Sequence, residues 1–79
     1  RREKLNNIGS LIDIIPMDIQ AAHRYAKIRV YLERQGAVIS ERDVQIASIA
    51  QSRDLILVSH NVKEFERVQD LTVEDWYSD

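Results

Sequence analysis

The sequence predicts an α/β fold in which a parallel sheet is flanked by helices. Two apolar runs rich in β-branched residues, LIDII at 11–15 and LILVS at 55–59, indicate strands, and two helical stretches lie between them. A short helical turn and an alternating run, LTVEDW at 71–76, follow the second strand. This alternation of strands and helices favours a parallel sheet.

The composition is that of one small domain. The chain has 79 residues, 44% hydrophobic and 30% charged, and its lack of cysteine excludes disulfides and thiolate metal sites and makes a cytoplasmic location the expected one. No apolar run approaches the roughly 18 residues that span a bilayer, so no membrane partner is expected. The net charge of −2 divides into +3 over 1–35 and −5 over 36–79. Such a division suits a nuclease with a phosphate-binding surface, and equally a protein with mixed surface helices.

The first half of the chain predicts a helix end, a strand and a long helix. Residues 1–10 are basic and polar, and they resemble the tail of a helix that ends at Gly9, before the strand at 11–15. Asp18 is a natural N-cap for the next helix, which ends at Gly36. The helical spacing predicts a buried stripe made of Ala21, Ala22, Tyr25, Ile28 and Leu32.

The second half predicts a further helix, two strands and a short helical turn. Ser40 caps the helix, and the strand at 55–59 is apolar throughout, as in a strand buried on both faces. A helical turn over 61–67 and a last strand over 71–76 complete the order. The buried face of the helix after Ser40 is expected to be Asp43, Ile46, Ala47 and Ala50.

Two acids stand where a parallel sheet would bring them together. Asp43 lies on an apolar stripe in the first turn of its helix, where burial is costly and the helix dipole favours a negative charge. Glu64 follows the end of the strand at 55–59. Because sites in such sheets form beyond the carboxyl ends of the strands, both carboxylates could converge on one edge and bind Mg²⁺ or Mn²⁺.

Each acid also has a purely structural explanation. Ser40-x-x-Asp43 and Asn61-x-x-Glu64 both have the spacing of a capping box. His60 stands four residues before Glu64, which is helical metal-ligand spacing, but a single pair of this kind is weak support for a metal site. Spacing alone leaves both explanations open.

Three ordered motifs resemble a known family. They are SERDVQIASIA at 40–50, LILVSHNVKEFERV at 55–68 and LTVEDW at 71–76, preceded by IIPMD at 14–18. Together they resemble the C-terminal part of a PIN domain, and most closely the VapC toxins of bacterial toxin–antitoxin systems. The EFERV variant is similar to the branch of that family that cuts initiator tRNA.

The resemblance implies an endoribonuclease that hydrolyses RNA with Mg²⁺ or Mn²⁺. It places Asp43 on a metal-binding Asp of the family and Glu64 on the last acidic position of the cluster, so these two are the expected catalytic and metal-binding residues. Ser59 and Asn61 fall on positions that support the site. The implied partners are RNA, with tRNA as one candidate, a cognate antitoxin and a second copy of the chain, since members of the family usually dimerise.

The N-terminal end departs from the family pattern. The family begins with a central strand that ends in a metal-binding Asp, and an early helix supplies a second acid; no such strand precedes Leu11. We therefore expect a C-terminal fragment, a single partial domain over 1–79, whose incomplete sheet associates edge to edge or by domain swapping. Little or no RNA cleavage is expected from the chain alone.

Two alternatives remain at this stage. One is a truncated, non-enzymatic remnant of a PIN domain that dimerises or binds an antitoxin. The other is an unrelated α/β domain in which Asp43 and Glu64 are only helix caps.

Overall fold

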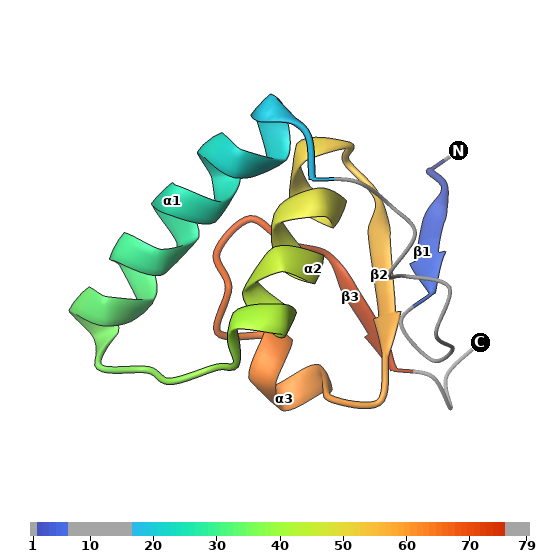
Figure 1. Cartoon of the computed structure of the whole chain (residues 1–79). Helices are drawn as coiled ribbons and strands as arrows, with labels where there is room; N and C mark the ends of the chain where they lie inside the picture. The colour runs from blue at the N-terminus through green and yellow to red at the C-terminus, as the bar shows by residue number, and fades with distance from the viewer. Residues whose placement is uncertain (1, 7–16, 76–79) are drawn as a thin grey trace.

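The computed structural model describes residues 2–6 and 17–75, and these form a parallel sheet with helices packed against it. The elements in chain order are β1 (Lys4–Asn6), α1 (Ile19–Gln35), α2 (Glu41–Ser52), β2 (Ile56–Ser59), α3 (Val62–Phe65) and β3 (Val73–Asp75). The strands run parallel in the order β1-β2-β3, so β2 is the central strand. Helix α1 packs on α2, and α2 packs on β2 (Figure 1). The predicted α/β class with a parallel sheet is confirmed.

Helix α1 begins and ends at the predicted residues, and α2 begins at its predicted cap. The Asp18 carboxylate accepts a hydrogen bond from the backbone N–H of Ala21 at 2.9 Å, which caps α1. Gly36 ends α1 in the left-handed conformation, with φ at 68°. The Ser40 hydroxyl accepts from the backbone N–H of Asp43 at 3.1 Å and caps α2. Side-chain caps of this kind satisfy backbone donors that the first helical turn leaves unpaired.

The hydrophobic core lies between the helices and the sheet. Phe65 of α3, Leu57 of β2 and Val44 of α2 are completely buried. One predicted core position is wrong: Ala22 is exposed, whereas Ala21 beside it is buried. Each helical residue turns by about 100°, so Ala22 lies past the edge of the stripe that faces α2.

Residues 4–6 form strand β1, so the predicted helix tail is wrong in this part of the chain. The backbone N–H of Ile56 donates to the carbonyl of Glu3 at 2.9 Å, and Leu5 is buried among the core residues. A central strand with an open edge would leave buried backbone groups unpaired, and β1 supplies those partners. Residues 4–6 are mostly polar, so their composition did not predict that they pair with β2. The predicted strand at 11–15 lies outside the described residues, as does Gly9.

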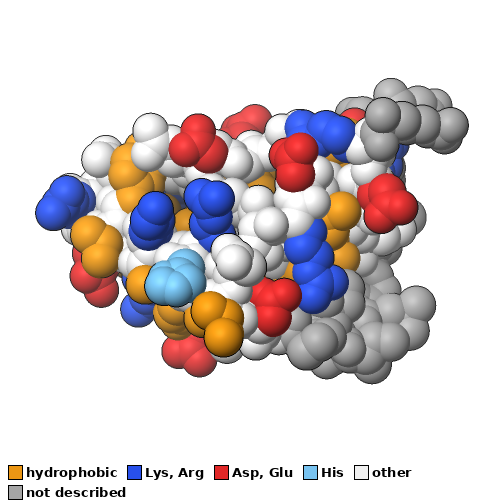
Figure 2. Space-filling view, turned by 90° about the horizontal axis from the view of Figure 1, so that it is seen from above, with side chains coloured by type: hydrophobic (Ala, Val, Ile, Leu, Met, Phe, Trp, Pro, Cys, Tyr) orange, Lys and Arg blue, Asp and Glu red, His pale blue; other side chains and the backbone are white. Residues whose placement is uncertain are grey.

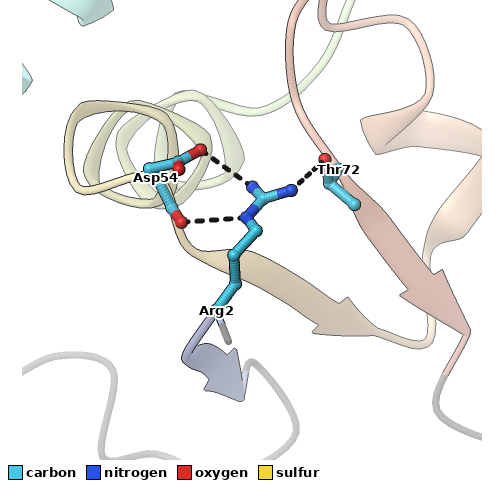
Figure 3. Close-up of polar contacts among 3 residues, drawn as sticks. All are labelled: Arg2, Asp54 and Thr72. Atoms are coloured by element: carbon cyan, nitrogen blue, oxygen red, sulfur yellow. Dashed lines mark hydrogen bonds and ion pairs between the residues drawn. The ribbon is translucent and has the colours of Figure 1, made fainter.

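Arg2 ties the start of the chain to the other two strands (Figure 3). Its guanidinium forms an ion pair with the Asp54 carboxylate at 3.0 Å and donates to the Asp54 carbonyl at 3.2 Å. It also donates to the Thr72 hydroxyl at 3.0 Å. Since Asp54 precedes β2 and Thr72 precedes β3, one side chain joins the amino ends of all three strands.

The outer surface of α1 carries apolar and basic side chains together. Ile19 of α1 is 75% exposed and Val38, in the link to α2, is 84% exposed. Figure 2 shows orange hydrophobic side chains and blue Lys and Arg side chains intermingled on the half of the molecule where α1 lies. No helix in the described part of the chain has both the length and the apolar character that a membrane span requires.

Candidate active site at the carboxyl edge of the sheet

The turn that joins β2 to α3 is built on a buried hydroxyl. Ser59, the last residue of β2, is 1% exposed, and its Oγ accepts a hydrogen bond from the backbone N–H of Asn61 at 3.1 Å. The Asn61 carbonyl then accepts from the backbone N–H groups of Glu64 and Phe65 at 3.1 and 3.2 Å, which starts α3. Phe65 is completely buried and anchors this short helix in the core.

Asn61 occupies the N-cap position of α3 but does not cap it with its side chain. The backbone of Asn61 makes the capping contacts, and its side chain makes no cap hydrogen bond. The capping-box explanation of Asn61-x-x-Glu64 therefore accounts for the start of the helix only through the backbone. Asn61 is one of the residues that line a pocket at this edge.

This pocket, of about 460 Å³, opens beyond the carboxyl ends of β2 and β3. Figure 1 shows α3 at the same end of the molecule as the arrowheads of these two strands. The lining residues are His60, Asn61, Val62, Lys63, Glu64, Arg67 and Asp75. The pocket thus combines two carboxylates, one side-chain amide and two cations.

Asp75 is the acid in this pocket that the sequence-based prediction missed. It is the last residue of β3, and the sheet register places it opposite Ser59. Sequence reasoning considered only acids at helix starts and treated LTVEDW as a strand. Asp75 could have been found from its position near the end of the predicted strand at 71–76. Ligand sites in parallel sheets form at the carboxyl ends of the strands, so an acid there is a candidate site residue.

Asp43 lies near this edge but does not line the pocket. It is half-buried in the first turn of α2, and its backbone N–H is bonded to the Ser40 hydroxyl. The N-terminus of α2 and α3 lie at the same end of the molecule (Figure 1). Arg67 donates to the Val38 carbonyl at 3.2 Å, which ties the turn after α3 to the link before α2.

The pocket therefore brings together some of the predicted site residues and not others. Glu64 and Asn61 share it, and Ser59 supports the turn beneath it. Within residues 2–6 and 17–75, no group of three or more acidic or histidine side chains is close enough to hold a metal ion. Metal binding by Asp43 and Glu64 together remains a prediction.

The donor atoms in the pocket suit a hard divalent cation. Glu64 and Asp75 offer carboxylate oxygens and Asn61 an amide oxygen, the ligand types that Mg²⁺ and Mn²⁺ prefer. Mg²⁺ is usually held by one or two protein carboxylates together with water and phosphate oxygens. The pocket offers two carboxylates, which is within the number that a protein usually supplies to Mg²⁺. The neighbouring Lys63 and Arg67 would attract an anionic substrate.

The sequence profile of the PIN domain matches residues 1–71 of the chain. Similar proteins include the tRNA(fMet)-specific endonuclease VapC of Shigella flexneri, 46% identical over 67 residues that cover 85% of this chain and 51% of that protein. Ribonuclease VapC2 of Rickettsia felis is 35% identical over 75 residues, which cover 95% of this chain and 56% of that protein. The chain thus spans about half the length of the curated relatives it matches.

The solved structures that resemble this chain also belong to VapBC proteins. VapBC-1 from nontypeable Haemophilus influenzae is similar with a TM-score of 0.75 and 38% identity, covering 82% of this chain and 48% of that one. VapBC2 from Rickettsia felis, bound to a DNA fragment from its promoter, gives a TM-score of 0.73 and 35% identity, covering 76% of this chain and 45% of that one.

Proposed function

Because the chain belongs to the PIN domain family, we propose that it carries part of the active site of a VapC-type endoribonuclease, which hydrolyses RNA phosphodiester bonds with Mg²⁺ or Mn²⁺. The observation that supports this most directly is the pocket shared by Glu64, Asp75 and Asn61 beyond the ends of two parallel strands. Since the Shigella flexneri relative is named for tRNA(fMet), tRNA is the first substrate to test.

In the proposed site Glu64 and Asp43 bind the metal ion, Asp75 of the pocket is a further carboxylate ligand to test, and Asn61 and Ser59 hold the turn in which Glu64 stands. When bound, the metal ion would lower the pKa of a water ligand and offset charge on the phosphate oxygens. Glu64 contributes a carboxylate from the pocket, and Asp43 contributes one from the start of α2. The cations of the pocket attract the RNA backbone.

The chain alone is proposed to cleave RNA weakly or not at all. The described residues gather no cluster of three acids, and such clusters hold the metal ions that stabilise the transition state in metal-dependent hydrolysis. Strong Mn²⁺-dependent cleavage by the purified chain that is abolished in Asp43→Asn would contradict this part of the proposal and support the assignment of Asp43.

The metal site is tested by thermal unfolding in the presence of Mn²⁺. The unchanged chain should unfold at a higher temperature as Mn²⁺ is added, because a ligand that binds only the folded state stabilises it by about 2.7 kcal/mol at 100 times its Kd. Glu64→Gln and Asp43→Asn should each reduce this shift. Glu66→Gln, an exposed acid outside the pocket lining, is the matched control and should keep it.

The proposal fails if Mn²⁺ does not raise the unfolding temperature of the unchanged chain. It also fails if Glu64→Gln responds to Mn²⁺ as fully as Glu66→Gln does. Either result would favour the structural explanation, in which both acids only support helix starts.

A second candidate function is that of a binding module for an antitoxin or for a second copy of the chain. The exposed apolar side chains of α1 and of the link after it favour this function. Ile19, Val30 and Val38 are 75%, 48% and 84% exposed. The similar solved structures are VapBC assemblies. Native mass measurement at micromolar concentration, with and without a VapB-type antitoxin, should detect a complex that Val30→Ser weakens. A compact monomer under both conditions would contradict this candidate.

A further inference from the structure

A second pocket lies away from the candidate active site, where α1 and α2 meet the turn before β3. It has a volume of about 160 Å³, and its lining residues are Arg24, Lys27, Ile28, Gln51, Gln69 and Asp70. Ile28 is buried and forms the apolar floor, whereas the other lining side chains are polar or charged. A pocket with an apolar floor and a polar rim can position a charged group.

The wall of this pocket is held by a specific contact between α2 and the turn. The Gln51 side-chain amide donates to the backbone carbonyl of Gln69 at 2.7 Å. Asp70 adopts a positive φ of 61°, which turns the chain into the segment that leads to β3. Val68, just before this turn, is buried and fixes it in the core.

Two cations of α1 face this pocket together. Arg24 and Lys27 are three residues apart, so they project from the same side of the helix. Neither forms an ion pair with any residue in the part of the chain that the structure describes. Asp70 is the one acid in the lining, so the pocket keeps an excess of positive charge.

The two pockets are joined by one short segment of the chain. Arg67 lines the pocket at the carboxyl edge, and Gln69 and Asp70 line the second pocket. Lys63 and Arg67 line the first pocket, and Arg24 and Lys27 line the second. Figure 2 shows Lys and Arg side chains on the α1 side of the surface, mixed with acidic and apolar ones.

We propose that the second pocket binds a phosphate group of the RNA backbone at a distance from the cleavage site. This inference rests on the proposed function, which supplies RNA as the ligand. Lys offers a compact charge and Arg a planar fork of N–H donors, and both bind phosphate oxygens strongly. The contact holds the RNA in position and reads no base, because phosphates carry no sequence information.

The test measures binding of a fluorescently labelled single-stranded RNA by anisotropy over a range of NaCl concentrations, with EDTA present. Arg24→Gln and Lys27→Gln should each weaken binding at low salt. Each should also make the slope of log K against log salt shallower by about 0.7, the value for one lost phosphate contact on single-stranded RNA. Arg29→Gln, which removes the same charge from α1 outside the pocket lining, is the control and should keep the slope of the unchanged chain.

A third variant is expected to change the RNA affinity in the opposite direction. Asp70→Asn removes the acid of the pocket, and asparagine also tolerates the positive φ at this position, so the fold is retained. This variant should bind the RNA more tightly than the unchanged chain.

The inference is overturned if Arg24→Gln and Lys27→Gln behave like Arg29→Gln. That result would leave the proposed function intact, since EDTA removes any contribution of the metal site. If the unchanged chain binds no RNA, both this inference and RNA as the ligand of the proposed function fail. The Mn²⁺ titration would still decide the metal site separately.

Discussion

At the scale of single residues, capping spacing did not decide between a structural and a functional role. Ser40 and Asn61 each stand three residues before an acid, yet only Ser40 caps its helix through its side chain. At the second turn the Ser59 hydroxyl accepts the Asn61 N–H, the contact that the Glu64 carboxylate would make in a capping box, and both Asn61 and Glu64 line the pocket. Sequence spacing cannot reveal that Ser59 makes this contact in place of Glu64, because it depends on the orientation of the Ser59 side chain at the end of β2.

Replacing Ser59 should therefore be costly, and replacing the other buried serine should not. Ser59→Ala removes the acceptor of the Asn61 N–H and should lower the free energy of unfolding by about 1 kcal/mol. Ser48 donates from its hydroxyl to the Val44 carbonyl, which also accepts a helical hydrogen bond, so Ser48→Ala should change stability by less than about 0.5 kcal/mol. Urea unfolding of both variants checks this, and equal losses would contradict it.

At the scale of elements, the sequence predicted those features that local chemistry determines. Caps and helical periodicity predicted both ends of α1 and the start of α2, and an apolar run predicted β2. Strand β1 was missed because a three-residue strand is determined by its partner, here β2, and its own composition is polar. In the candidate site, Glu64 was predicted from its place after a strand and Asn61 from the family resemblance, whereas Asp75 was missed because it ends a strand whose side-chain directions depend on the register.

The end of α1 offers a test of one local feature. Gly36 has a positive φ of 68°, and a methyl group added there would meet no atom within 4 Å. Gly36→Ala should thus lower the free energy of unfolding by about 1 kcal/mol through backbone strain alone. Gly36→Asn should cost less, because asparagine tolerates this conformation. Chemical denaturation of both variants measures the difference, and an Ala variant as stable as the unchanged chain would contradict the assignment.

At the scale of the whole molecule, the sheet is held by contacts that are distant in sequence. The described strands are three or four residues long, and β2 alone has a partner on each side. Lys4 and Glu74, on the two outer strands, form an ion pair at 3.0 Å across β2. Arg2 joins the amino ends of the same strands. Exposed ion pairs add little to global stability, so these contacts should matter for the local attachment of β1.

Hydrogen exchange can measure that attachment separately from global unfolding. The backbone N–H of Ile56 donates toward β1, to the Glu3 carbonyl, whereas the N–H of Leu57 donates toward β3, to the Thr72 carbonyl. Arg2→Met removes the contacts with Asp54 and Thr72, so β1 should detach more often as a unit. The Ile56 amide should then exchange faster while the Leu57 amide keeps its protection. If both amides lose protection equally, Arg2 stabilises the whole fold; if neither changes, β1 is held by its backbone pairing and by the burial of Leu5.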